Sequence, residues 1–364
     1  MNRGMRWVLA AGVLLLLVGG GVWLARGGAK QDSTASLPES KTPLTTPSAA
    51  GVQPGVKSVL PAAVTPPSRA TFAHAGWGHG PNELGRDRPK EGNPEAPMSL
   101  TTDANGNTLV LDQVNGRIVK YDRAGKAKGS IPLTVQSAQD LQVAKDGTTV
   151  VLDRLTDRSI ALVDPEGHLR GELKVEGKNI TEGGAVTGLI VDGNDVYLER
   201  EHGDLVRVGD TAGNADPERP EIPGRPTKDG KAYVSAGITD AQAGKVFINS
   251  VDRATKEHRY TRELTLGQPV SAITFLDSNL AGTVYMGLLL NSPVDPKAPD
   301  AVPTFSLHLV CLDPADGRPL GQTILPVNTL ADETFRDLAI SEPAGVTYSF
   351  RTEAGVELQH YDCR

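Results

Sequence analysis

Short apolar stretches separated by Gly, Asn and Asp turns recur along most of the chain. The clearest case is a unit that occurs twice, with an apolar strand at 109–112 followed by one at 116–122, and again at 150–153 followed by 158–164. The Asp residues that end the first strands are 41 residues apart, and those that end the second strands are 42 residues apart. A period of this size indicates stacked or radial repeats.

Four further units have the same rhythm. Apolar and polar residues alternate between turn signals, which predicts β-strands rather than helices. These units begin near residues 188, 233, 272 and 335. The sixth unit ends after three strands, and an incomplete sheet would expose an edge. We expect a strand at about 71–77, which precedes the first unit, to supply the missing outer strand. Residues 70–364 are therefore predicted to form an all-β, six-bladed β-propeller with four-stranded blades. A solenoid would need polar caps, which are not found at the ends of the array.

The N-terminal region has a different pattern. Residues 7–25 form an uncharged, mainly apolar run of 19 residues, close to the length of a membrane-spanning helix. Arg3 and Arg6 precede it, which places the N-terminus in the cytoplasm. Residues 1–30 are thus predicted to be a cytoplasmic tip and a transmembrane signal anchor. The alternative is a cleaved signal peptide and a secreted protein. In both cases the remaining chain is exported, to the periplasm or otherwise beyond the cytoplasm.

Residues 31–69 are rich in Pro, Ser and Thr and have no apolar period of 2 or 3.6. Such a composition cannot bury enough apolar surface to offset chain entropy. This segment is predicted to be a disordered linker that holds the propeller away from the membrane.

The first repeat resembles an NHL repeat. The residues that carry the resemblance are Val110-Leu-Asp112, Asn115, Arg117-Ile-Val119, Tyr121-Asp122 and Gly125, preceded by the Gly-rich lead-in at 76–81. The second unit matches more loosely, and the others match only in strand rhythm. The resemblance implies a six-bladed propeller with a central channel and a surface that binds another protein or a ligand. Some six-bladed relatives are lyases or lactonases that use a channel-bound cation. This chain has no matching His or carboxylate motif to carry that role over.

Composition and charge narrow the function classes. The chain contains 40 Gly and 26 Pro, which suits many short strands joined by turns. Its net charge of −7 and its lack of a pattern of stacking aromatic residues exclude a nucleic-acid-binding surface. None of the seven His has a short metal-binding spacing, and no catalytic residue is identified.

Four residues are candidates for a ligand site at the mouth of the channel. Asp140 and Asp337 each begin an innermost strand, Ser99 has the same place in the first unit, and Arg336 is adjacent to Asp337. A ligand or cation site, with calcium as the candidate ion, is one interpretation. The other is a solvated channel lining in which the Asp residues accept hydrogen bonds from backbone N–H groups of neighbouring blades.

The two cysteines, Cys311 and Cys363, both lie near the end of a third strand, in units five and six. In an exported protein they are able to form a disulfide if their Cα atoms lie within about 7 Å. Such a bond would fasten the C-terminus.

These observations favour a membrane-anchored, exported propeller that acts as a non-catalytic scaffold for a protein or ligand of the cell envelope. Its binding surface would be a blade face or the long loops expected at 85–96, 213–230 and 291–303. One alternative is a channel-site hydrolase or lyase that uses a bound cation. A second is a purely structural part of an envelope assembly.

Overall fold

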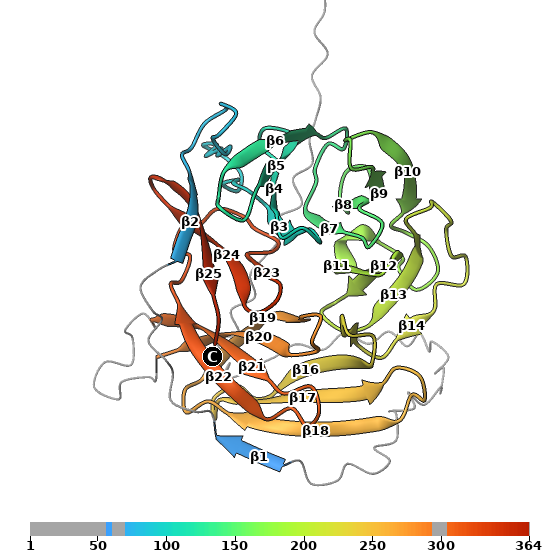
Figure 1. Ribbon diagram of the computed structural model, residues 1–364, viewed down its shortest axis with the longest axis vertical. Coiled ribbons are helices and arrows are strands. Elements are labelled where there is room, and N and C mark those ends of the chain that lie inside the picture. Colours follow the sequence, from blue (N-terminus) through green and yellow to red (C-terminus); the bar gives the residue numbers. More distant parts are fainter. Residues whose placement is uncertain (1–55, 60–69, 293–303, 364) are drawn as a thin grey trace, which may run out of the picture. The chain divides into compact units, whose positions relative to one another are not determined.

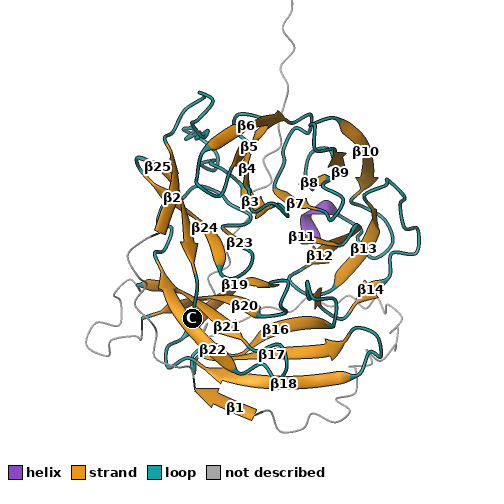
Figure 2. Cartoon of the chain, viewed as in Figure 1, coloured by secondary structure: helices purple, strands orange, loops and turns teal. Residues whose placement is uncertain are grey.

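Six β-sheets follow one another along the chain and stand around a common centre (Figure 1). The computed structural model describes residues 56–59, 70–292 and 304–363. The predicted anchor at 1–30, and all of the predicted linker except residues 56–59, lie outside these ranges. Among the described residues, no helix is long and apolar enough to cross a membrane. The only helical element in these ranges is a 3₁₀ turn, η1 (Gly183–Ala185), and the rest is strand and loop (Figure 2). The prediction of an all-β, six-bladed propeller is confirmed.

Each sheet is one blade, built mainly from strands that are consecutive in the chain. Blade 1 contains β3 (Ser99–Thr102), β4 (Thr108–Asp112), β5 (Arg117–Tyr121) and β6 (Ala127–Pro132). Blade 2 contains β7 (Asp140–Val143), β8 (Thr149–Asp153), β9 (Ser159–Val163) and β10 (Leu169–Lys174). Blade 3 contains β11 (Val186–Asp192), β12 (Asp195–Arg200), β13 (Leu205–Asp210) and β14 (Glu221–Ile222). Blade 4 contains β15 (Arg225–Pro226), β16 (Ala232–Asp240), β17 (Lys245–Asp252), β18 (His258–Thr265) and the distant β1 (Val56–Val59). Blade 5 contains β19 (Val270–Ser278), β20 (Val284–Asn291), β21 (Phe305–Leu312) and β22 (Pro319–Leu325). Blade 6 contains β23 (Leu338–Ile340), β24 (Val346–Thr352), β25 (Gly355–Tyr361) and β2 (Ala70–Ala75).

The outer strand of blade 6 comes from the start of the ring. Strand β2 pairs antiparallel with β25, with His74 opposite Glu357. Strand β2 also lies against blade 1, at the turn that contains Gly125. This residue has φ +79°, and a side chain there would overlap the carbonyl oxygen of Phe72 on β2. The beginning and the end of the ring are thus joined by main-chain hydrogen bonds, which removes the open edge that the sixth repeat would have had.

Blade 4 has an unusual outer strand. Strands β15 to β18 give this blade four strands, and residues 266–269 then lead directly from β18 to β19. Strand β1 is a fifth strand at the outer edge and pairs in parallel with residues 262–265 of β18. Arg262 strengthens the contact, since its Nη1 donates to Ser58 Oγ at 2.7 Å. This strand lies inside the range expected to be a disordered linker. The segment that precedes the ring is therefore held at blade 4 as well as at blade 6.

The core lies between neighbouring blades. Ile160 and Leu173 of blade 2, for example, pack with Leu189 and Val206 of blade 3, and all four are at most 1% exposed. Aliphatic side chains dominate these layers, as the low aromatic content of 4% predicts. Burial of these faces on both sides of each blade stabilises the ring without a single central core.

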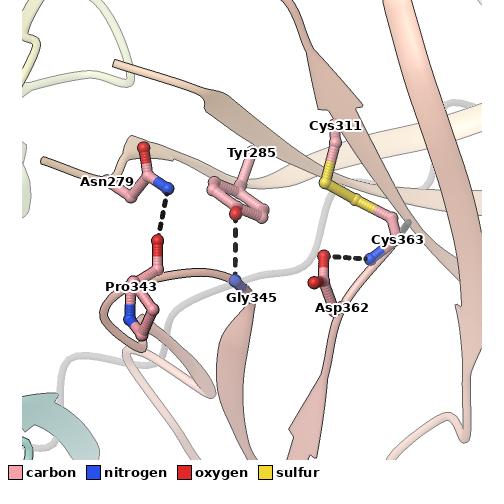
Figure 3. Close-up of a disulfide and its surroundings, with 7 residues drawn as sticks. All are labelled: Asn279, Tyr285, Cys311, Pro343, Gly345, Asp362 and Cys363. Carbon is pink, nitrogen blue, oxygen red and sulfur yellow. Dashed lines mark hydrogen bonds between the residues drawn. A yellow bond between two sulfur atoms is a disulfide. The ribbon is translucent and has the colours of Figure 1, made fainter. Parts of the chain in front are cut away.

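A disulfide joins blades 5 and 6 (Figure 3). Cys311 lies on β21 and Cys363 follows β25, and their Cα atoms are 6.0 Å apart. Further hydrogen bonds connect the same two blades, because Tyr285 Oη accepts from the backbone N–H of Gly345 at 2.9 Å. The bond closes a loop with a sequence separation of 52 residues, next to the strand that pairs with β2.

Candidate functional site

Asp140 is the centre of the candidate site at the channel mouth. It begins β7 and is fully buried. Its Oδ1 accepts hydrogen bonds from Ser99 Oγ at 2.6 Å and from the Leu141 N–H at 2.9 Å. Its Oδ2 accepts from the Leu189 N–H at 3.1 Å. The carboxylate therefore joins the innermost strands of blades 1, 2 and 3.

Arg336, which is 196 residues from Asp140 in the sequence, completes this cluster. It lies on the segment that leads into β23, and its Nε and Nη2 donate to the two carboxylate oxygens of Asp140 at 3.0 and 2.7 Å. Nη2 also donates to the Leu189 carbonyl at 2.8 Å. Burial alone would lower the pKa of Arg336, but the carboxylates of Asp140, Asp277 and Glu199 together raise it. This bidentate pair is a strong, charge-assisted contact between blade 2 and the segment that enters blade 6.

A second arginine links the other side of the ring. Arg225 begins β15 in blade 4, and its Nη2 donates to Glu199 Oε1 at 2.6 Å on blade 3. Its Nη1 donates to the Leu276 carbonyl on blade 5. Burial would raise the pKa of Glu199, but Arg225 lowers it below its ordinary value, so the carboxylate stays ionised. Arg336 and Arg225 together tie all six blades near the axis of the ring.

Asp337 belongs to a different cluster. Its carboxylate accepts from Thr334 Oγ1 at 2.9 Å, from Asn328 Nδ2 at 3.1 Å and from Arg351 Nη2 at 3.2 Å. The side chain of Arg351 is only 2% exposed. Of the four predicted site residues, the structure thus brings Ser99, Asp140 and Arg336 together and places Asp337 in the packing of blade 6.

The cluster around Asp140 does not suit a calcium ion. Calcium needs six to eight oxygen ligands, several of them from carboxylates with free lone pairs. Both oxygens of Asp140 already accept from a guanidinium group, and Arg336 places its positive charge where the ion would be. Elsewhere in the described ranges, one group of potential metal ligands is close enough, and it consists of Cys311, Asp362 and Cys363. Its two sulfur atoms are joined in the disulfide and offer no thiolate.

Two loops, residues 85–96 and 327–337, lie next to each other where β3 and β23 begin, and we call this pair of loops the rim of the channel mouth. They are held together by backbone hydrogen bonds, with the Glu333 N–H donating to the Pro94 carbonyl at 2.8 Å. Arg86 reaches across and forms ion pairs with the buried Asp332 at 3.0 Å and with Glu353 at 2.9 Å. The predicted loop at 85–96 is therefore a fixed part of the rim.

The other two expected loops differ from this one. Residues 213–230, expected to be one long loop, are loop except at β14 and β15, so the prediction is wrong at these two short strands. Most of the third, residues 293–303, lies outside the described part of the chain. Arg225 was not among the predicted site residues for this reason. A charged residue at the start of an innermost strand was the signal that identified Asp140, and it applies equally to Arg225 once β15 is recognised.

The carboxyl groups of Asp87, Glu95 and Glu333 lie close together at this rim. Their repulsion should make the stability of the protein depend on pH through Glu95. Burial, Glu333 and Asp87 all raise the pKa of Glu95 above its ordinary value, while a hydrogen bond from Gln113 opposes them. The folded state therefore binds this proton more tightly than the unfolded state, and stability falls as pH rises from 4.5 through the raised pKa. We expect Glu95→Gln to increase the free energy of unfolding at about pH 7 by up to about 0.5 kcal/mol, since the site is partly exposed and screened. At about pH 4 the gain should disappear, because both states are then protonated.

Urea unfolding at the two pH values measures this difference. Glu91→Gln, at an exposed position on the same loop, is the matched control and should change stability at neither pH. An equal gain for Glu95→Gln at both pH values would contradict the repulsion among the three carboxyl groups.

No protein-family model matches this sequence, and no curated protein matches it. The NHL resemblance of the first repeat therefore stays a prediction. Among solved structures, similar folds include the hydrazine synthase of Kuenenia stuttgartiensis, at 15% identity and TM-score 0.44 over 72% of this chain and 75% of that one. A member of the DUF4221 family from Bacteroides vulgatus has 9% identity and TM-score 0.44 over 78% and 98%. The virginiamycin B lyase of Staphylococcus aureus has 11% identity and TM-score 0.39 over 76% and 98%. None of these likenesses assigns a function at such identities and scores. The hydrogen-bonded sheets themselves make this chain a six-bladed β-propeller.

Proposed function

We propose that this protein is an exported propeller, anchored to the membrane by its N-terminal segment, that binds another protein or a ligand of the cell envelope without catalysing a reaction. The N-terminus lies in the cytoplasm in this proposal, and the ring lies in the periplasm or otherwise outside the cytoplasm. The disulfide between Cys311 and Cys363 supports export, since such bonds persist in oxidising compartments.

The state of Asp140 is the observation that carries the proposal. A general acid, a general base or a metal ligand must present a free oxygen to a substrate or ion. Asp140 is fully buried and accepts from Arg336, Ser99 and two backbone N–H groups. Glu199 is likewise paired with Arg225. These groups hold the blades in place, which favours a rigid binding scaffold over a catalytic channel.

The rim loops are the surface that such a scaffold would present. Arg86 and Asp332 fix the loop at 85–96, while Lys90 and Glu91 at its tip are exposed. A rigid loop with an exposed charged tip loses little conformational entropy on binding. We therefore place the partner at the rim of the channel mouth.

Site-specific photo-crosslinking of the full chain in its native membrane tests this proposal. A photo-reactive residue at Glu91 should give a discrete crosslinked partner. The same residue at Lys174, an exposed position on β10, is the control and should not. The same product from both positions, or none from Glu91, would overturn the proposed surface.

The alternative, a cation-dependent hydrolase or lyase, has its own readout. Calcium at about 5 mM exceeds the dissociation constants of weak extracellular calcium modules. We expect it to leave the thermal unfolding midpoint unchanged after dialysis against a chelator. An increase in the midpoint that Asp140→Asn abolishes would instead support the enzyme.

A further inference from the structure

A cavity of about 370 Å³ lies between blades 1 and 2. Its walls come from the hairpin at 103–107, the outer strand β6 and the hairpin at 144–148. Strands β3 and β7 begin at Ser99 and Asp140 near the channel mouth and run towards these hairpins. The cavity is therefore at the other end of the blades and is separate from the rim described above.

Three lysines line this cavity, namely Lys120, Lys128 and Lys145. Lys120 Nζ forms an ion pair with Asp103 Oδ2 at 2.9 Å. Across the described ranges, neither Lys128 nor Lys145 forms an ion pair with an acidic side chain. The chain as a whole carries a net charge of −7. Two lysines without an ion-pair partner at one cavity therefore make this part of the surface more positive than the protein as a whole. Such a departure favours anions at this place.

Asp103 offsets the charge of Lys120 and forms no ion pair with Lys128 or Lys145. Its carboxylate accepts from Asn107 Nδ2 at 2.7 Å and from the backbone N–H groups of Asn105 and Asn107. Burial by itself would raise the pKa of Asp103, but these bonds and Lys120 lower it below its ordinary value. The negative charge is therefore engaged in holding the hairpin and Lys120.

The rest of the wall is largely apolar. Leu109 and Ala144 are buried, and Ile131, Val143 and Pro165 complete this side. A volume near 370 Å³ is within the range of small-molecule sites, which combine apolar walls with a few polar groups that set orientation. Inorganic anions alone would leave the apolar wall uncovered.

We propose that this cavity binds a small organic anion, a carboxylate or phosphate ester with a short apolar body. Lys128 and Lys145 contact the anionic group, and the wall formed by Ile131 and Val143 contacts the apolar part. Exposed lysines are strongly hydrated point charges that tolerate either anion geometry. This site goes beyond the proposed partner surface at the channel mouth and does not depend on it.

Calorimetric titration of the full chain at low salt tests the proposal with four probes. Hexanoate and hexyl phosphate carry both features and distinguish the two anions, inorganic phosphate carries only charge, and hexanol carries only the apolar body. We expect at least one of the first two probes to bind with a dissociation constant of about 1 mM. The last two should bind at least about tenfold more weakly, since each lacks one of the two contacts. Equal binding of inorganic phosphate would overturn the apolar contact, and equal binding of hexanol would overturn the ionic one.

Substitutions in the wall of the cavity test whether the probes bind there. The double variant Lys128→Gln/Lys145→Gln should weaken the bound probe about tenfold or more, because charge-assisted contacts are lost. The matched control is Lys90→Gln/Lys174→Gln, which removes two exposed lysines elsewhere and should leave affinity within about twofold. Ala104→Trp, at an exposed position on the wall, should block the cavity while keeping all three lysines.

Three results would overturn the site. These are no binding of either amphiphilic anion, an unchanged affinity in the double lysine variant, and an unchanged affinity in Ala104→Trp. Crosslinking from Glu91 at the channel mouth reports on the proposed function independently, so the failure of either proposal is distinguishable from that of the other.

Discussion

Arg336→Met is expected to lower the free energy of unfolding of the propeller by about 3–5 kcal/mol, the effect of removing one partner of a buried ion pair. The methionine fills part of the volume but leaves the fully buried Asp140 carboxylate without its bidentate partner. The Leu189 carbonyl also loses a hydrogen bond from Arg336 Nη2. Because these contacts join blade 2 and blade 3 to the segment that enters blade 6, the loss should affect the whole ring.

Urea unfolding at neutral pH measures this change in the free energy of unfolding. One further variant is a control at an exposed ion pair, and another tests the role of the unpaired carboxylate. Arg158→Met removes an arginine whose side chain is 58% exposed and paired with Glu176, so it should change stability by no more than about 1 kcal/mol. The double variant Arg336→Met/Asp140→Asn removes both charges and should recover part of the loss. A double variant that is less stable than Arg336→Met alone would contradict the role assigned to the unpaired carboxylate.

The second large effect is expected from the disulfide. Replacing both Cys311 and Cys363 by Ser should lower the free energy of unfolding by about 2–4 kcal/mol. The two cysteines are 52 residues apart in the sequence. A cross-link that closes a loop of this length lowers the conformational entropy of the unfolded chain substantially. It also fastens the segment after β25, the strand on which β2 closes the ring.

Unfolding of the native, the reduced and the doubly substituted protein measures this contribution. The reduced native protein and the double Ser variant should agree with each other, and reductant should have no effect on the variant. Labelling of free thiols in the unreduced native protein should find none. Two labelled thiols per chain would contradict the bond.

The strands themselves were predictable because their cause is local. Alternation of apolar and polar residues with a period of two requires one buried and one less buried face, whatever lies next to the strand. Strand β17 follows this pattern, with Val246, Ile248 and Ser250 buried and the residues between them less buried. The strands at 109–112 and 150–153 are instead buried on both faces and were recognised as short apolar runs between turns. Their spacing of about 40 residues then leaves few architectures other than a ring of small sheets. The Asp-Gly turns were predictable for the same reason, since Asp122 accepts from the N–H groups of Ala124 and Lys126 within its own turn.

Strand β1 was not predictable from such patterns. Residues 56–59 lie in a Pro- and Ser-rich stretch, and four residues are too few to show a period. Their conformation depends on the edge of β18, which the chain that follows β18 leaves unpaired. The short β14 and β15 were missed for a related reason, because two-residue strands are defined only by the neighbours they pair with.

The sequence by itself determined that this chain repeats a small four-stranded sheet six times and that charged residues begin several of the innermost strands. Only the tertiary structure decided which charges meet. Arg336 and Asp337 are adjacent in sequence, yet Arg336 reaches Asp140 while Asp337 is held with Arg351. The physical reason is that a strand pattern depends on the nearest residues, whereas an ion pair across the ring depends on how six separate sheets are packed around one axis.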